Sequence, residues 1–131
     1  MAQRAVTFRD LRVYRNAFRL QQEIFRVSRL FPDQEKYSLT SQIRRSSRSI
    51  GGNITEAWQK RRYAAHFVSK LTDSDAKNAE TQHWLHTAHS CDYILRETCD
   101  ELTRSSNEIG AMLGKMINDP DSLVQIVVAT R

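Results

Sequence analysis

The chain has 131 residues, enough for one domain with a real core but too few for two. It contains four glycines and two prolines, which disfavours a sheet protein rich in tight turns and favours a few long helices. No apolar run approaches the ~20 residues that span a bilayer, and the first ten residues lack the apolar segment of a secretory signal. We therefore expect a cytoplasmic protein without a membrane partner, with Cys91 and Cys99 as free thiols.

The net charge of +5 conceals an uneven distribution along the chain. Residues 1–62 hold 14 Lys and Arg against 5 Asp and Glu, whereas residues 63–131 hold 6 against 10. The first half is therefore a cation and the second half a mild anion. Such a division provides a basic face for a polyanion, or lets two helix pairs attract each other within or between subunits.

The first helix is predicted over residues 8–31. Thr7 is placed as its N-cap with Asp10 at the third helical position, and Pro32 ends it. The predicted inner face comprises Leu11, Tyr14, Ala17, Phe18, Ile24 and Phe25, widened by Val13, Leu20 and Phe31. This arc is broader than one bundle seam requires, which is a first indication of a subunit interface.

The opposite side of this helix carries a basic stripe. Its members are Arg12, Arg15, Arg19 and Arg26, flanked by Arg9 and Arg29. Like charges at spacings of three or four residues repel each other by a few tenths of a kcal/mol per pair, and a polyanion would relieve that repulsion. The alternative is that the stripe is simply a solvated helix face.

The second helix is predicted over residues 38–61, after a short connection that suits two antiparallel neighbours. Its expected buried seam is narrow and rich in small residues, namely Leu39, Ile43, Ser46, Ser47, Ile50, Ile54 and Ala57. Arg44, Arg45 and Arg48 lie on the other side. Gly51 and Gly52 would each cost about 1 kcal/mol relative to alanine, so we expect a neighbouring backbone to come close there.

Two further features mark this helix. Gln42, Ser49, Asn53 and Glu56 line one edge, where they either fix register across a helix interface or face water. Lys60, Arg61 and Arg62 lie at its end between Trp58 and Tyr63. Cations there complement the helix dipole, and cations among aromatic rings also suit single-stranded nucleic acid.

The same residues carry a family resemblance. The run Tyr37-Ser38-Leu39, Gln42-Ile43-Arg44-Arg45, Ser49-Ile50 and Asn53-Ile54-x-Glu56 resembles the signature of the 23S ribosomal RNA intervening-sequence proteins, four-helix bundles related to the accessory proteins of diversity-generating retroelements. The resemblance extends from about Phe8 to Ile117. It implies a homo-oligomer, a ring of five bundles, in which Asn53 and Glu56 tie helices or subunits together. By analogy it also implies a reverse transcriptase as a partner.

The third helix is predicted over residues 64–96. Phe67, Leu71, Leu85, Ala88 and Leu95 recur at heptad-like spacing, but the seam between them is polar, reading Ser74, Asn78 and Thr81. Either the helix changes register there, or a polar layer crosses the bundle.

The fourth helix is predicted over residues 99–118, introduced by Thr98 and Glu101 as a capping box and ended before Pro120. The tail, residues 121–131, is too apolar for an ordinary disordered end. It packs on a neighbouring subunit, pairs as a short strand, or frays.

Catalytic and metal chemistry find little support. A di-iron bundle needs two Glu-x-x-His pairs and two further carboxylates, and the chain has a single pair, Glu80 with His83. His83, His86 and His89 turn around the helix, so that at most two could share one ion. No phosphate-cradling glycine loop or nucleophile elbow is present. We expect no catalytic residue, no metal and no cofactor.

The sequence thus predicts an all-α, up-down-up-down antiparallel four-helix bundle that is not an enzyme, assembles with itself and binds the RNA or DNA backbone through its first two helices. The cations expected to neutralise phosphates are Arg12, Arg15, Arg19, Arg26, Arg44, Arg45, Arg48, Lys60, Arg61 and Arg62. The alternative is an oligomeric protein-binding scaffold, in which the basic half of one subunit meets the acidic half of its neighbour.

Overall fold

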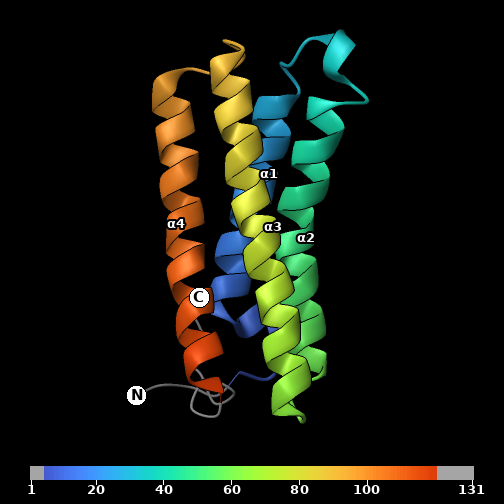
Figure 1. Cartoon of the computed structure of the whole chain (residues 1–131), viewed down its shortest axis with the longest axis vertical. Coiled ribbons are helices and arrows are strands. Elements are labelled where there is room, and N and C mark those ends of the chain that lie inside the picture. Colours follow the sequence, from blue (N-terminus) through green and yellow to red (C-terminus); the bar gives the residue numbers. More distant parts are fainter. Residues whose placement is uncertain (1–4, 121–131) are drawn as a thin grey trace.

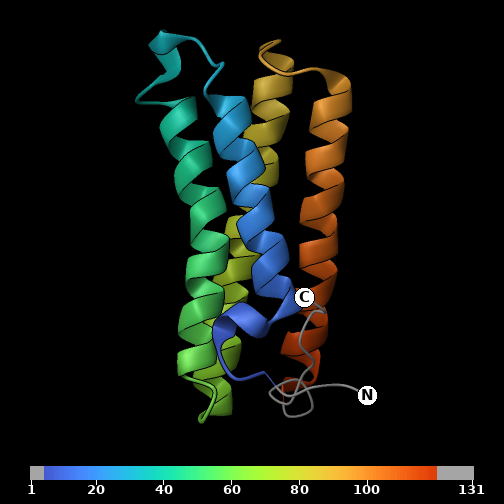
Figure 2. The same cartoon turned by 180° about the vertical axis from the view of Figure 1, so that it is seen from behind.

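Four long helices form an antiparallel bundle in the computed structural model, which describes residues 5–120 (Figure 1). They are α1 (Arg12–Ser28), α2 (Leu39–Gln59), α3 (Ala64–Ser90) and α4 (Arg96–Asn118), with short 3-10 turns η1 (Phe8–Asp10) and η2 (Asp33–Glu35). Each helix packs on its neighbours in sequence, and α1 also packs on α4, so that α1 and α3 lie diagonally opposite (Figure 2). The predicted all-α, up-down-up-down bundle is confirmed. The tail, residues 121–131, lies outside the described residues.

The first helix begins later than predicted, at Arg12 instead of Phe8. The capping box of Thr7 and Asp10 forms, with Thr7 Oγ1 accepting from the Arg9 N–H at 3.2 Å and the Asp10 carboxylate accepting from the Thr7 N–H at 3.0 Å. It caps the turn η1, because Leu11 has an extended backbone (φ −72°, ψ 128°) that separates η1 from α1. The predicted end at residue 31 is also too late, since α1 stops at Ser28.

The boundary between the third and fourth helices also differs from the prediction. α3 ends at Ser90 instead of residue 96, because Asp92 adopts a left-handed conformation with φ 62°. The Tyr93 N–H donates to the Ala88 carbonyl at 2.9 Å and the Asp92 N–H to the His89 carbonyl at 3.0 Å, the two bonds of a Schellman motif. α4 then starts at Arg96, so Thr98 lies inside its first turn and does not cap it.

The α2 seam is confirmed: all seven residues predicted to face the core are buried. The arc predicted for α1 is rotated. Leu11, Ala17 and Ile24 are buried together with Val13, Leu20 and Phe31, which were expected only to widen the arc. Tyr14, Phe18 and Phe25 instead lie at the edge of the core, where they remain partly or largely accessible.

The polar middle of α3 is buried. Ser74, Asn78 and Thr81 form a layer with Ser46 of α2 and Ser106 of α4, which we call the polar layer. Ser74 Oγ donates to the Ile50 carbonyl at 2.8 Å, and Asn78 Nδ2 donates to the Ser106 carbonyl at 2.9 Å. Ser106 Oγ donates in return to Asn78 Oδ1 at 2.7 Å. Because these buried polar groups hydrogen-bond to one another, the polar layer lies inside the bundle and α3 keeps the same face toward the core along its length.

The glycine pair of α2 has no neighbouring backbone against it, contrary to the prediction. A Cβ on Gly51 would meet the Tyr14 ring at 3.5 Å, an ordinary contact, and a Cβ on Gly52 would meet nothing within 4 Å among the described residues. Gly51 therefore lies under an aromatic side chain of α1, and Gly52 faces open space.

Candidate nucleic-acid interface

An aromatic edge runs along α1 beside α2. Tyr14, Phe18 and Phe25 are four and seven residues apart, which keeps them within about 40° of one another on the helix. The Tyr14 and Phe18 rings are stacked with centroids 6.1 Å apart, and Phe8 meets Tyr14 edge-on at 4.9 Å. Phe18 is 44% exposed. We call Tyr14, Phe18 and Phe25 the aromatic edge.

Three guanidinium groups surround the ring of Phe25. The Cζ atoms of Arg29, Arg44 and Arg48 lie 5.6, 4.8 and 5.6 Å from its centroid. We call these three residues the Phe25 arginine cluster. Arg29 follows Phe25 by one turn of α1, and the other two come from the facing turns of α2, so the antiparallel packing of the two helices assembles the cluster.

The arginine nearest the ring is held in place. Arg44 Nε donates to Ser28 Oγ at 2.8 Å, and Ser28 Oγ donates to the Phe25 carbonyl at 3.0 Å. Burial, followed by the charges of Arg48 and Arg29, lowers the pKa of the Arg44 guanidinium. The like charges therefore act on one another across the ring.

No carboxylate neutralises this cluster within residues 5–120. The ion pairs of α2 and α3 instead join Lys70 to Glu56 and Asp73, and Lys77 to Glu80. Three cations gathered around one ring, with their charges unpaired by acids, form a local field suited to an anion. Guanidinium groups match the oxygens of a phosphate in two-point contacts.

The basic stripe of α1 borders the aromatic edge. Arg12, Arg19 and Arg26 are exposed, whereas Arg15 is half-buried and its Nε donates to the Arg9 carbonyl at 2.9 Å. A shallow hollow of about 610 Å³ joins the stripe to the aromatic edge, and it is lined by Arg9, Tyr14, Arg15, Phe18, Arg19 and Gln22. Cations and accessible rings therefore share one surface.

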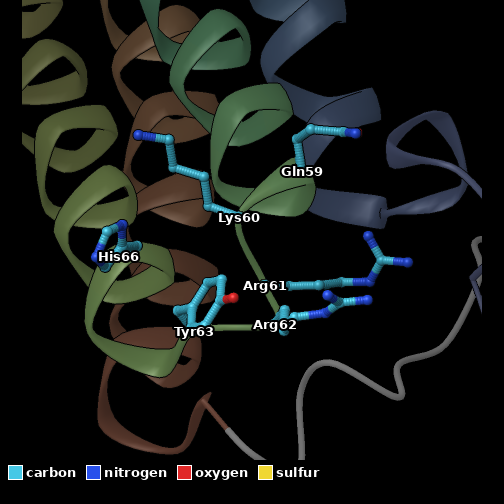
Figure 3. A pocket seen from close by; sticks show the side chains of 6 residues that line it. All are labelled: Gln59, Lys60, Arg61, Arg62, Tyr63 and His66. Carbon is cyan, nitrogen blue, oxygen red and sulfur yellow. The ribbon is translucent and has the colours of Figure 1, made fainter.

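A second basic region lies in the turn between α2 and α3. Lys60, Arg61 and Arg62 follow the end of α2 at Gln59 and do not belong to its last turn, contrary to the predicted end at residue 61. With Gln59, Tyr63 and His66 they line a hollow of about 670 Å³. The Arg61 and Arg62 side chains extend to one side of the turn, and Lys60 extends to the other (Figure 3).

The side chains in this turn differ in how firmly neighbouring groups hold them. Arg61 is fixed, with its Cζ 3.8 Å from the centroid of the Trp58 ring and its Nη1 donating to the Trp58 carbonyl at 2.8 Å. Tyr63 is 60% exposed and its ring lies 5.8 Å from that of His66. Of the two rings that the sequence placed beside these cations, Tyr63 is accessible and Trp58 is buried.

The predicted cations do not all converge. Arg44 and Arg48 meet at Phe25, whereas Arg45 is exposed on another side of α2. Arg29 was placed only at the flank of the basic stripe, and the structure makes it a member of the Phe25 arginine cluster. The spacing of four residues between Phe25 and Arg29 was the sequence signal that could have predicted this contact.

The polar line of α2 mostly forms bonds within its own helix. Ser49 Oγ donates to the Arg45 carbonyl at 2.8 Å, Asn53 Nδ2 donates to the Ser49 carbonyl at 2.9 Å, and Gln42 is exposed. Glu56 differs, because its carboxylate pairs with Lys70 Nζ of α3 at 3.1 Å. Within the chain, Glu56 is thus the member of this line that links two helices.

The residues weighed for metal binding have other partners. Glu80 accepts from Trp84 Nε1 at 3.0 Å and pairs with Lys77 at 3.2 Å. The hydrogen bond from Trp84 is the main cause that lowers the pKa of Glu80. Across residues 5–120 the structure holds no group of three or more His, Cys, Asp or Glu placed to bind a metal ion, and no helix there is long and apolar enough to cross a membrane.

Comparisons with known proteins agree with the fold. A crystal structure from Bacteroides thetaiotaomicron VPI-5482, described as a protein with unknown function from the S23 ribosomal protein family, is 30% identical with a TM-score of 0.73, covering 80% of this chain and 97% of that one. No curated protein matches the sequence. The family described as 23S rRNA-intervening sequence protein matches residues 9–115. Since this match spans most of the chain, the protein is a member of the 23S rRNA-intervening sequence protein family.

Proposed function

We propose that this protein is a non-enzymatic nucleic-acid-binding protein, which contacts the RNA or DNA backbone through the basic surface of α1 and α2. The observation that carries the proposal is the Phe25 arginine cluster. The three guanidinium groups are attracted to the ring but repel one another, and a phosphate between them would relieve that repulsion.

The surrounding charge supports the same proposal. Arg12, Arg19 and Arg26 continue the basic surface along α1, and Lys60, Arg61 and Arg62 continue it beyond the end of α2. None of these six side chains pairs with an acid of residues 5–120. Backbone contacts of this kind bind phosphate without reading sequence, so we expect affinity for generic RNA and DNA.

The test is binding of labelled nucleic acid, followed by fluorescence anisotropy as salt is raised from about 50 to about 300 mM. We expect roughly micromolar affinity at low salt and a steep decline with salt. The double variant Arg29→Gln/Arg48→Gln removes two cations of the cluster while leaving the anchored Arg44. It should weaken binding and lower the salt slope by about 1.4 for a single strand, since each neutralised phosphate contributes about 0.7.

The matched control removes two charges elsewhere. Arg104 and Lys115 are exposed on α4, which lies diagonally across the bundle from α2. Arg104→Gln/Lys115→Gln lowers the net charge by the same amount. Because these two residues lie away from the Phe25 arginine cluster, the variant should leave the salt slope near that of the parent protein. The proposal fails if the parent binds neither RNA nor DNA at about 50 mM salt, or if the two double variants lose affinity equally.

A second candidate function is an oligomeric protein scaffold, favoured by apolar side chains at one end of the bundle. Leu30 and Tyr37 in the α1–α2 connection are 84% and 87% exposed, and Leu95 in the α3–α4 connection is 72% exposed. Both connections lie at the same end (Figure 1). Exposed apolar groups that gather in this way are typical of interaction surfaces.

This candidate predicts a defined assembly, with five subunits as the family resemblance implies. Light scattering across a salt series measures its mass. An assembly that dissociates as salt rises, in a protein that binds no nucleic acid, would favour the scaffold, because charge attraction between subunits is screened by salt.

A further inference from the structure

We infer that the surface where α1 meets α2 binds a single-stranded nucleic acid in preference to a duplex, with unpaired bases stacking on the aromatic edge. The inference rests on the proposed function and specifies its substrate class. Its basis is a set of partly exposed rings on the basic surface, of which Phe18 and Phe25 lie outside the packed core.

The rings and the cations are interleaved along one surface. The aromatic edge extends from Tyr14 to Phe25, about 16 Å along α1 at a rise of 1.5 Å per residue. Near Phe25 it is bordered by Arg44 and Arg48 of α2, and near Phe18 by Arg19. A strand lying along this edge would meet cations and aromatic rings in alternation.

The turn of α2 that packs against Tyr14, at the N-terminal end of the aromatic edge, carries two glycines. Gly51 lies beneath Tyr14, with a position for Cβ only 3.5 Å from that ring, and next to it Gly52 faces open space. Gly51 is buried, so its lack of a side chain lets Tyr14 pack closely on α2, whereas Gly52 leaves the exposed α2 surface next to it without a side chain. Tyr14 is thus held against α2, and Phe18, which stacks on it, is the ring left accessible to a flat ligand such as a base.

Stacking distinguishes the two kinds of nucleic acid. In a duplex the base faces are already stacked on each other, so a duplex offers these helices mainly its phosphates. An unpaired base exposes its face, and stacking on an aromatic side chain contributes substantially to single-strand affinity. Phe18 is stacked on Tyr14 yet remains 44% exposed, so it is the ring best placed to receive a base.

The alternative occupant of this edge is a second copy of the chain. An apolar partner surface would cover the rings, but it would also bury the guanidinium groups of Arg44 and Arg48 beside Phe25. Burying these charges against an apolar surface is costly, so a second copy would have to cover them with acidic residues of its own. The mixture of rings and cations therefore favours a ligand that carries both aromatic faces and negative charge.

The experiment compares Phe18→Ala with the parent protein, using one labelled RNA strand of about 20 nucleotides and the duplex formed from the same strand. Phe18→Ala should weaken single-strand binding about 5- to 100-fold, the usual effect of removing a base-stacking ring, and change duplex binding less than about twofold. Phe18→Tyr, which keeps an aromatic ring, should retain single-strand affinity. Val6→Ala is the matched control, because it truncates an exposed apolar side chain outside both the aromatic edge and the apolar end of the bundle.

The outcomes separate this inference from the proposed function. If the parent protein binds strand and duplex equally, with the expected salt dependence, the function stands and the single-strand preference is wrong. The single-strand preference is also wrong if Phe18→Ala weakens binding of the strand and the duplex equally, or if it weakens neither. If Phe18→Ala changes the mass of the assembly and not the single-strand affinity, the ring packs against a second copy instead. Absence of any binding by the parent refutes the function itself.

Discussion

Replacing Asn78 by alanine should destabilise the bundle more than any exposed substitution. Its side chain is 3% exposed and makes two hydrogen bonds to Ser106 of α4, one donated at 2.9 Å and one accepted at 2.7 Å. Alanine removes both bonds and leaves a small void between α3 and α4. The Ser106 hydroxyl also loses the acceptor of its own proton.

The magnitude can be worked out from these contacts. Each hydrogen bond contributes about 0.5 to 1.5 kcal/mol net, so the pair contributes about 1 to 3 kcal/mol. The void adds to this loss. Ser106 Oγ still accepts from Gln82 Nε2 at 2.9 Å, which limits the penalty for an unpaired buried group. We expect Asn78→Ala to lower the free energy of unfolding by about 2 to 3 kcal/mol.

Urea unfolding followed by circular dichroism measures this change, at one protein concentration because self-association would shift the midpoint. Asn107→Ala is the matched control: this exposed asparagine only accepts from Gln82, at 2.9 Å, so its loss should cost less than about 0.5 kcal/mol. In a double-mutant cycle, Asn78→Ala combined with Ser106→Ala should cost less than the sum of the single changes. A loss below about 0.5 kcal/mol for Asn78→Ala, or strict additivity in the cycle, would refute the reasoning.

Three further predictions concern the surface. Gly52→Ala should raise the free energy of unfolding by up to about 1 kcal/mol, because the added methyl group meets open space; a loss of stability would reveal an unseen neighbour. Hydrogen bonds from Ser38 and then Tyr93 hold the pKa of Glu35 below its usual 4.5, so their stabilisation is present above that pH and disappears as pH falls through the lowered pKa. The melting temperatures of the parent and Glu35→Gln should therefore converge in acid, and a constant difference would contradict this. Arg48→Gln should weaken nucleic-acid binding while leaving thermal stability nearly unchanged, since the lost contact with the Phe25 ring and the relieved repulsion with Arg44 oppose each other; lower stability with unchanged binding would assign Arg48 to folding.

Local patterns were sufficient for the helices and for one helix face. The scarcity of glycine and proline, with apolar residues at helical spacing, predicted four long helices, and the small-residue seam of α2 was correct at every position. Thr7 is an N-cap with Asp10 at the third position, as predicted, because the bonds of this cap join residues close in sequence, although it caps η1 and not α1. Features that depend on nearest neighbours along the chain can therefore be predicted from the chain alone.

The helix boundaries show where local patterns fail. The end of α3 depends on Asp92 adopting a left-handed conformation, which glycine usually signals and aspartate does not. The rotation of α1 similarly depends on which of two apolar edges its neighbours cover. Val13 and Leu20 were covered by the bundle, and Phe18 was left at the surface.

The amino-acid sequence by itself therefore determined the class of fold, the buried face of α2 and the presence of an arginine-rich first half. Only the tertiary structure decided that the polar middle of α3 is a satisfied layer, because Asn78 finds its partner 28 residues away on another helix. It also decided which arginines meet, since Arg29 joins Arg44 and Arg48 only when α1 and α2 pack antiparallel around Phe25. The physical reason is the same in both cases: a side chain's partners across a helix interface depend on the relative rotation and register of two helices, and neither quantity is contained in the pattern of one helix alone.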